Sequence, residues 1–238
     1  MPPTNDPNPA AGYVTFHEIG ARTPGDAHRI AEASTRLLRR YTRHSPGFRS
    51  ARVHLSLDGT AVVVRGEWDG AQRPDTALGG PAGRMLRHAE RLGPVPVSSF
   101  RGIPAPGIEG PAKGRRPGLV VVATRQVGNA DNAHKLSGLL LRSGEWKGDF
   151  SGFVAADPCV SEDGGTYVNY PQWVDEDAYD AYMNDPRNAE GRKAIADLEV
   201  APPRFVMCTM LAQIDAEPSR PGLRAPAAEN PTGPRSGQ

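Results

Sequence analysis

The sequence lacks the motifs that mark several common classes of site. Its 238 residues include only two cysteines, Cys159 and Cys208. Both fall in apolar segments, which favours buried free thiols over a disulfide or a catalytic thiol. The six histidines show no metal-ligand spacing such as H-x3-H, so no metal is expected. There is also no G-x-G-x-x-G or P-loop motif, which argues against a Rossmann-type cofactor site.

Net charge and long apolar runs are also scarce. The formal net charge is +1, which gives no reason to expect a nucleic-acid or an anionic-membrane partner. No apolar run approaches about 18 residues, and the N-terminus has no basic-then-apolar signal segment. We therefore expect a soluble, cytoplasmic protein whose length allows one large domain or two small ones.

What the chain does contain is an element order that occurs twice. In the first unit, residues 12–103, the sequence predicts a strand at 13–19 and then a helix that Thr23 begins. Strands at 52–57 and 61–68 follow, joined by the hairpin turn Asp58-Gly59. A helix near 82–92 and a strand near 97–103 complete the unit. The second unit, residues 118–214, predicts a strand at 118–126, a helix at 131–146, strands at 154–160 and 167–173, helices near 176–183 and 187–198, and a strand at 204–214. Gly- and Pro-rich composition marks 104–117 as a linker, and 1–11 and 215–238 as disordered ends.

Anchor residues keep one register across the two units. The pairs, each 105 positions apart, are Phe48 and Phe153, Trp68 and Trp173, Pro81 and Pro186, and Phe100 and Phe205. Each unit has the ferredoxin-like β-α-β-β-α-β order, which leaves one sheet face open. Two such faces can close into a barrel. We predict an α+β fold in which two fused ferredoxin-like repeats form an intramolecular dimeric α+β barrel, either as a monomer or as a homodimer.

A set of polar and aromatic side chains distinguishes the second repeat. The strand period of two and the helix that follows bring the set together. Its members are Tyr167, Asn169, Trp173, Tyr179 and Tyr182. The first repeat has Val64 at the position of Asn169 and Pro74 at that of Tyr179. Because a constraint of the shared scaffold should leave both halves alike, we predict a single working site in the second repeat.

The spacing Asn169-x3-Trp173-x5-Tyr179, in a strand-then-helix context, resembles the antibiotic biosynthesis monooxygenase family of dimeric α+β barrels. Within that family it is most similar to small quinone-forming monooxygenases of aromatic polyketide pathways. The resemblance implies that these three residues act with a downstream arginine, for which Arg192 is the nearest candidate and Arg187 the next. The substrate would contact further side chains, namely Phe153, Tyr167, Tyr182 and Met183.

The resemblance implies an oxygenase that tailors an aromatic polyketide. It would oxidise a phenolic polycycle, similar to an anthrone or an angucycline, with dioxygen to a quinone or a ring-opened product. Deprotonation of such a substrate gives a carbanion that can itself reduce dioxygen, so no bound cofactor is expected. Tandem family members that open or contract angucycline-type rings use reduced flavin, which keeps a diffusible reduced flavin and a flavin reductase as an alternative.

Other functions remain open from the sequence. An aromatic polyketide cyclase would use the same residues for proton transfer without oxygen, and a non-catalytic ligand-binding barrel would use them without turnover. Haem degradation would need an axial histidine about ten residues after the tryptophan, where Met183 stands. Trp173 could also belong to the core, as Trp68 in the other repeat suggests.

Overall fold

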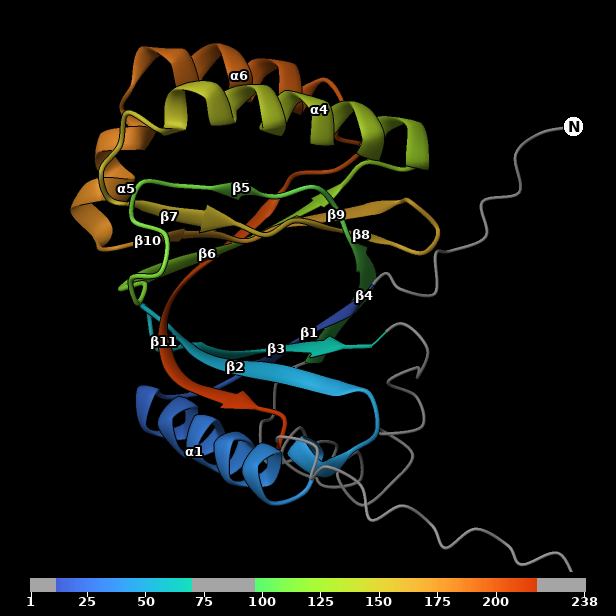
Figure 1. The fold of residues 1–238 in the computed structure, drawn as a ribbon, viewed down its shortest axis with the longest axis vertical. Helices are drawn as coiled ribbons and strands as arrows, with labels where there is room; N and C mark the ends of the chain where they lie inside the picture. The colour runs from blue at the N-terminus through green and yellow to red at the C-terminus, as the bar shows by residue number, and fades with distance from the viewer. Residues whose placement is uncertain (1–11, 70–96, 218–238) are drawn as a thin grey trace, which may run out of the picture.

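Eight antiparallel strands close into a barrel, and helices cover it on two opposite sides (Figure 1). This computed structural model describes residues 12–69 and 97–217. The strand order around the barrel is β11-β2-β3-β1-β4-β8-β9-β6, and β11 returns to β6 to complete the ring. The predicted α+β barrel is therefore confirmed.

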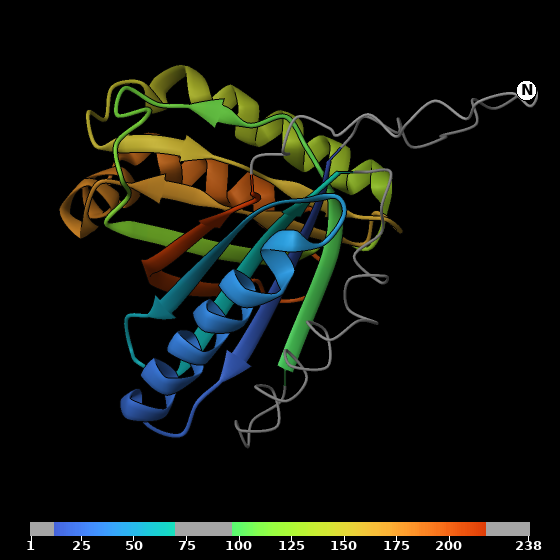
Figure 2. The same cartoon turned by 60° about the horizontal axis from the view of Figure 1, so that its bottom comes forward.

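The first repeat forms one half of the barrel. Its elements are β1 (Tyr13–Gly20), α1 (Pro24–Arg40), the short 3-10 helix η1 (Thr42–His44), β2 (Phe48–Ser56), β3 (Ala61–Trp68) and β4 (Val97–Pro104). The Thr23 side chain accepts a hydrogen bond from the backbone of Asp26 and begins α1. Ala27, Ile30 and Leu38 bury the inner face of α1 against the sheet, and Figure 2 shows the helix lying along these strands. The helix predicted near 82–92 lies outside the described residues.

The second repeat forms the other half and carries more helix. A short strand, β5 (Ile108–Glu109), lies in the segment that connects the repeats. The repeat itself consists of β6 (Leu119–Gln126), α4 (Ala130–Lys147), β7 (Phe153–Ala156), β8 (Cys159–Ser161), β9 (Thr166–Asn169), β10 (Pro171–Trp173), α5 (Glu176–Met183), α6 (Pro186–Ala196) and β11 (Arg204–Asp215). The three helices cover the outer face of this sheet (Figure 1). Beyond β11, most of the predicted tail is outside the described residues.

Two strands that the sequence predicts as continuous are each broken in the middle. The strand predicted at 154–160 is divided into β7 and β8, and the one at 167–173 into β9 and β10. Pro158 and Pro171 stand at the breaks, where each removes a backbone donor and restricts the residue before it. The prediction of one unbroken strand was therefore wrong. Because of the breaks, β8 and β9 stay in the barrel while β7 and β10 form an extension paired with β5 and β6.

The last strand of each repeat closes the barrel by pairing with the other repeat. β4 pairs with β8, and β11 pairs with both β6 and β2. Cys208 is the point of exchange, with Val120 of β6 on one side and Ser56 of β2 on the other. A register shift between Met210 and Ala212 follows, where β11 runs from one sheet to the other. The two repeats are thus one structural unit.

The repeat seen in the sequence is also visible in the packing. In the first repeat the rings of Phe48 and Trp68 lie 5.3 Å apart, and in the second those of Phe153 and Trp173 lie 4.9 Å apart. Both predicted thiols are free and buried inside the protein. None of the helices in the described ranges is long and apolar enough to cross a membrane.

Candidate active site

Six aromatic side chains gather between the second sheet and its helices. We call this set the aromatic layer; its members are Trp146, Phe150, Phe153, Trp173, Tyr179 and Tyr182. Trp173 is fully buried, with ring centroids 4.9 Å from Phe153 and 5.0 Å from Tyr182. Tyr182 also stacks on Trp146 at 5.3 Å and an interplanar angle of 18°. Such a layer matches the flat face of a polycyclic ligand.

The local sequence explains how α5 joins this layer. Asp175 follows Trp173 almost at once and accepts a hydrogen bond from the backbone of Ala178, which begins the helix. Tyr179 and Tyr182, three residues apart, lie on one face of α5 and both reach the indole of Trp173. No residue of α5 is fully buried. The helix is therefore attached to the sheet mainly through its two tyrosines.

Two polar groups on this sheet face have no hydrogen-bond partner. The indole Nε1 of Trp173 is buried and unpaired within the described part of the chain. Asn169 is 9% exposed, and its amide makes no hydrogen bond to any residue of 12–69 or 97–217. Since Val168 faces the barrel interior, Asn169 points to the opposite side, toward the helices. An unpaired buried polar group costs about 1–3 kcal/mol, so a ligand that accepts a hydrogen bond from the Trp173 indole would be stabilised here. The Asn169 amide is not among the fully buried unpaired groups, so this cost is not assigned to it.

A buried lysine lies beside the same rings. Lys147, in the last turn of α4, is 2% exposed, and its Nζ is 5.3 Å from the ring centroid of Tyr182 and 5.7 Å from that of Phe153. No carboxylate of the described residues pairs with it. Burial lowers the pKa of Lys147 to about 8, from an ordinary value of 10.5. A lysine whose pKa is that low is a candidate general base.

The sequence reasoning did not single out Lys147, although a signal for it exists. Leu136, Leu140 and Lys147 follow one another at four and seven residues along α4, so all three occupy the same stripe of the helix. A charged residue at a core position of an amphipathic helix is a recognisable exception to the pattern.

The structure also brings a further arginine into the electrostatic surroundings of the tyrosines. Arg192 is exposed on α6. Arg125, on β6, has a side chain only 13% exposed that forms an ion pair with Glu199 and lies 5.2 Å over the ring of Phe205. Both arginines lower the pKa of Tyr179 and of Tyr182, and the effect of Arg125 is the larger at each. Arg125 was not predicted, because its contact with Glu199 joins positions 74 residues apart.

The tyrosines of the layer keep their protons. Burial is the main cause that raises the pKa of Tyr182 to about 12, and burial likewise raises the pKa of Tyr179. Both phenols are therefore neutral at ordinary pH and can donate hydrogen bonds. A proton relay through Tyr179 would start from the neutral form.

The remaining predicted residues are spread over three places. Tyr167 is buried under α4 and α6 with Leu136, in a neighbouring cluster rather than in the aromatic layer. The Met183 sulfur accepts a hydrogen bond from Asn188 at the junction of α5 and α6. Arg187 is engaged by Asp149 and Asp185 and covers the ring of Trp146 at 4.7 Å. The structure thus brings Phe153 together with Trp173, Tyr179 and Tyr182, and Arg187 lies over the layer's Trp146 and Phe150. Tyr167 and Met183 do not belong to the layer.

Two cavities lined by described residues lie away from Asn169 and Trp173. One of about 650 Å³ and one of about 390 Å³ open near the junction of the repeats, and neither is lined by Asn169 or Trp173. Tyr182, which contacts both indoles of the layer, occupies the position where a flat ligand would make the same contacts.

Comparison with known proteins identifies solved structures that share this fold. No family model and no curated protein matches the chain. An anthrone oxidase-like protein is 16% identical, with a TM-score of 0.69 over 87% of this chain and 94% of that chain. A ferredoxin fold protein related to antibiotic biosynthesis monooxygenases, from Listeria monocytogenes, is 8% identical, with a TM-score of 0.51 over 85% of this chain and 96% of that chain.

A shorter match has higher identity. The monooxygenase from the gene ActVA-Orf6 of Streptomyces coelicolor, solved with nanaomycin D, is 39% identical over 40% of this chain and 88% of that chain, with a TM-score of 0.38. Solved structures similar to this chain therefore include ferredoxin-fold proteins related to the antibiotic biosynthesis monooxygenases, in keeping with the resemblance drawn from the sequence.

Proposed function

We propose that this chain, which shares the α+β barrel fold of antibiotic biosynthesis monooxygenase-like proteins, is an oxygenase that tailors an aromatic polyketide. Its substrate would be a phenolic polycycle of the anthrone or angucycline type, and its product a quinone or a ring-opened compound. The resemblance in the sequence and the fold of the anthrone oxidase-like protein support this reaction class. We assign the site to the aromatic layer of the second repeat.

One observation carries the proposal. The unpaired indole N–H of Trp173 and the buried amine of Lys147 both adjoin the aromatic layer, and the unpaired amide of Asn169 lies on the same sheet face. The equivalent indole of Trp68 in the first repeat is also unpaired, so it is the combination with the buried Lys147 amine and the Asn169 amide that distinguishes this layer from an apolar core. Donors, a base and flat apolar walls are what oxidation of a carbanion requires.

The reaction on an anthrone balances without another reductant. A base removes a proton from the methylene carbon between the rings, and the resulting carbanion transfers an electron to dioxygen. Combination of the two radicals forms a C–O bond, and protonation gives a hydroperoxide. Loss of water then breaks the O–O bond and leaves a carbonyl group. The substrate is oxidised to a quinone, while one oxygen atom enters the product and the other leaves as water.

Each step needs a group that this site can supply. The Lys147 amine, about a tenth of it neutral at pH 7, would take the proton. The Asn169 amide and the Trp173 indole would donate hydrogen bonds to the enolate oxygen or the peroxide. Arg125 would stabilise the negative charge, and neutral Tyr179 would return a proton.

Substrate entry would require α5 to move. Because α5 has no fully buried residue and is attached through Tyr179 and Tyr182, its displacement exposes the indole of Trp173 at modest cost. A bound polycycle would take the place of the Tyr182 ring against Trp146. The closed site would then exclude water from the carbanion.

The test is incubation with an anthrone and with an angucycline under air and under argon, each with and without reduced flavin. Oxygen uptake equal to quinone formed, with one atom of labelled dioxygen in the product, is the expected result in air without flavin. Turnover only with reduced flavin would assign the flavin-dependent alternative. Product under argon would indicate a cyclase, and binding without turnover in any arm would indicate a ligand-binding barrel.

A further inference from the structure

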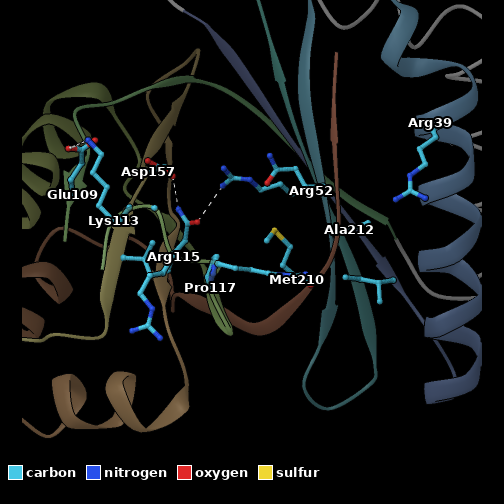
Figure 3. A pocket seen from close by; sticks show the side chains of 16 residues that line it. Arg39, Arg52, Glu109, Lys113, Arg115, Pro117, Asp157, Met210 and Ala212 are labelled. Carbon is cyan, nitrogen blue, oxygen red and sulfur yellow. Dashed lines mark hydrogen bonds and ion pairs between the residues drawn. The ribbon is translucent and has the colours of Figure 1, made fainter. Parts of the chain in front are cut away.

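A cavity of about 650 Å³ lies on the other side of the second sheet from the aromatic layer (Figure 3). Gln172 lines it, whereas its neighbour Trp173 belongs to the aromatic layer, and successive side chains of a strand point to opposite faces. Its walls come from both repeats and from the turn that precedes β6. The volume is within the range of small-molecule sites, about 300–1,000 Å³.

The lining of this cavity is strongly basic. Five cationic side chains meet two carboxylates there; the cations are Arg39, Arg52, Lys113, Arg115 and Arg116. The whole chain carries a formal net charge of only +1. Positive charge is therefore concentrated at one hollow, where it attracts and retains anions.

The two carboxylates leave most of these cations without a charged partner. Glu109 pairs with Lys113 at 2.6 Å, and Asp157 accepts from Gln172 at 2.7 Å (Figure 3). Arg115 and Arg39 form no ion pair with any residue of the described segments. Since these carboxylates do not neutralise them, the arginines are available to an anionic ligand.

Arg52 is the lining residue whose surroundings best fit an anion-binding site. It stands directly across from Arg65 on β3, and two like charges in that position repel each other. Arg65 is neutralised by Glu67, whereas Arg52 forms no ion pair among the described residues and has two neutral neighbours, the amide oxygen of Gln172 at 3.4 Å and the hydroxyl of Tyr170. The Nε of Arg52 is buried without a partner among the described residues. A guanidinium held in this way matches a carboxylate or a phosphate.

The cavity also has an apolar side. Pro117, Val154, Met210 and Ala212 line it, and Leu211, at the β11 bulge, is 42% exposed. Met210 lies at its centre in Figure 3, between Arg52 and Pro117. An occupant therefore needs an apolar body as well as an anionic group.

We infer that this cavity is a second ligand site, which binds an organic anion through Arg52, Arg115 and Arg116 and receives its apolar part along β11. The anionic group is a carboxylate or a phosphate, because both accept paired hydrogen bonds from a guanidinium. This site is separate from the proposed oxygenase site and does not depend on it.

Two matched pairs of probes test the inference and separate the two anions. FMN carries a phosphate that riboflavin lacks. 9-Anthracenecarboxylate carries a carboxylate where 9-anthracenemethanol has a neutral hydroxymethyl group. Binding of each probe to the full chain is measured by calorimetry near physiological ionic strength. We expect the anion of at least one pair to bind about tenfold or more tightly than its neutral partner, and the pair that responds identifies the anionic group.

Charge reversal locates the site. The double substitution Arg115→Glu and Arg116→Glu should weaken anion binding about tenfold or more. Arg115→Glu alone, at an exposed and unpaired residue, serves as a second variant that leaves the Arg116 hydrogen bond to Met210 intact. The matched control, Lys135→Glu with Arg142→Glu, changes net charge equally on exposed α4 and should leave binding within about twofold.

Three results would overturn the inference. The anions could bind no better than their neutral partners, the control could weaken binding as much as the cavity variants, or both cavity variants could bind unchanged. Oxygen uptake with an anthrone is measured on the same variants. This assay tests the proposed oxygenase function separately, so failure of the anion site can be distinguished from failure of that function.

Discussion

Replacing Lys147 by methionine should make the protein more stable and the enzyme less active. Methionine keeps the length of the buried stem and removes the charge from among the rings of Phe153 and Tyr182. The two effects have opposite signs because the ammonium is unfavourable to the fold while the amine is useful to the reaction. If Lys147 were only a packing residue of the core, its replacement would not raise stability while lowering activity.

The magnitude follows from the pKa of Lys147. Lowering it from 10.5 in the unfolded chain to about 8 in the folded one corresponds to a destabilisation of about 3 kcal/mol when the lysine is charged. The unfolded state binds the extra proton between pH 8 and 10.5, so this destabilisation is fully present below pH 8 and disappears as the pH rises to 10.5. Lys147→Met should therefore gain up to about 3 kcal/mol at pH 7 and almost nothing near pH 10.5.

Urea unfolding at pH 7, 8.5 and 10 measures this gain, with Lys135→Met as the control. Lys135 lies on the same helix with an exposed side chain, so its replacement should shift stability by less than about 0.5 kcal/mol at any of these pH values. A Lys147→Met variant that is less stable than the parent at pH 7, or equally stabilised at pH 7 and pH 10, would show that the ammonium is solvated or paired and that the pKa argument is wrong.

Kinetics complete the test. A general base contributes about 100- to 10,000-fold, so kcat/KM for an anthrone should fall by that order in Lys147→Met. In the parent enzyme kcat/KM should rise with pH and level off above pH 8, where the amine is neutral. Unchanged turnover in the variant would remove Lys147 from the mechanism, whatever its effect on stability.

Three further predictions concern the site. Trp173→Phe removes the unpaired indole donor and should lower turnover about 100-fold, whereas the matched Trp68→Phe in the first repeat should lower it less than about threefold; equal losses would assign both tryptophans to packing. Asn169→Ala should lower turnover by about the same factor at an unchanged melting temperature, and a fall in that temperature with no loss of rate would give the amide a structural role. Arg125→Met leaves Glu199 buried without its ion-pair partner and should lower the free energy of unfolding in urea by about 3–5 kcal/mol. The same change at exposed Arg192 should lower it by less than about 0.5 kcal/mol. Similar losses in the two variants would contradict the difference in burial.

The elements that the sequence predicted correctly are those determined by neighbouring residues. Thr23 caps the first helix, Gly59 adopts the positive φ of 68° that the hairpin turn requires, and the apolar stripe of α1 faces the sheet. The repeat added the long-range information, because two copies of one open sheet have few ways to close. The barrel could thus be predicted although no single strand specifies it.

What was missed depends on contacts between distant residues. The sequence shows both Pro158 and Pro171, but that the two neighbouring strands are both interrupted, with Pro171 opposite Ala156, is seen only in the folded sheet. In the sequence, Arg125 is an ordinary polar residue near the end of a strand, and its burial depends on the contact with Glu199 that forms only in the folded protein. Burial of Lys147 depends on the approach of α5 to α4, which periodicity along one helix does not reveal.

The two repeats differ at more positions in the structure than the strand motif alone indicates. Comparing them shows which unpaired hydrogen-bond donors are particular to the second repeat. The indole Nε1 of Trp68 is buried without a partner, like that of Trp173, so an unpaired indole by itself belongs to the shared scaffold. The other polar groups of the site have no such counterpart. At the 105-residue offset, Val64 stands for Asn169, Thr42 for Lys147 and Gly20 for Arg125. At these three positions an amide, a base and a buried cation occur together in the second repeat and not in the first, on the side of the barrel where α5 and α6 cover the sheet. Duplication supplied both barrel halves, whereas the Asn169 amide, the Lys147 amine and the Arg125 guanidinium stand at positions where the first copy has residues of other types.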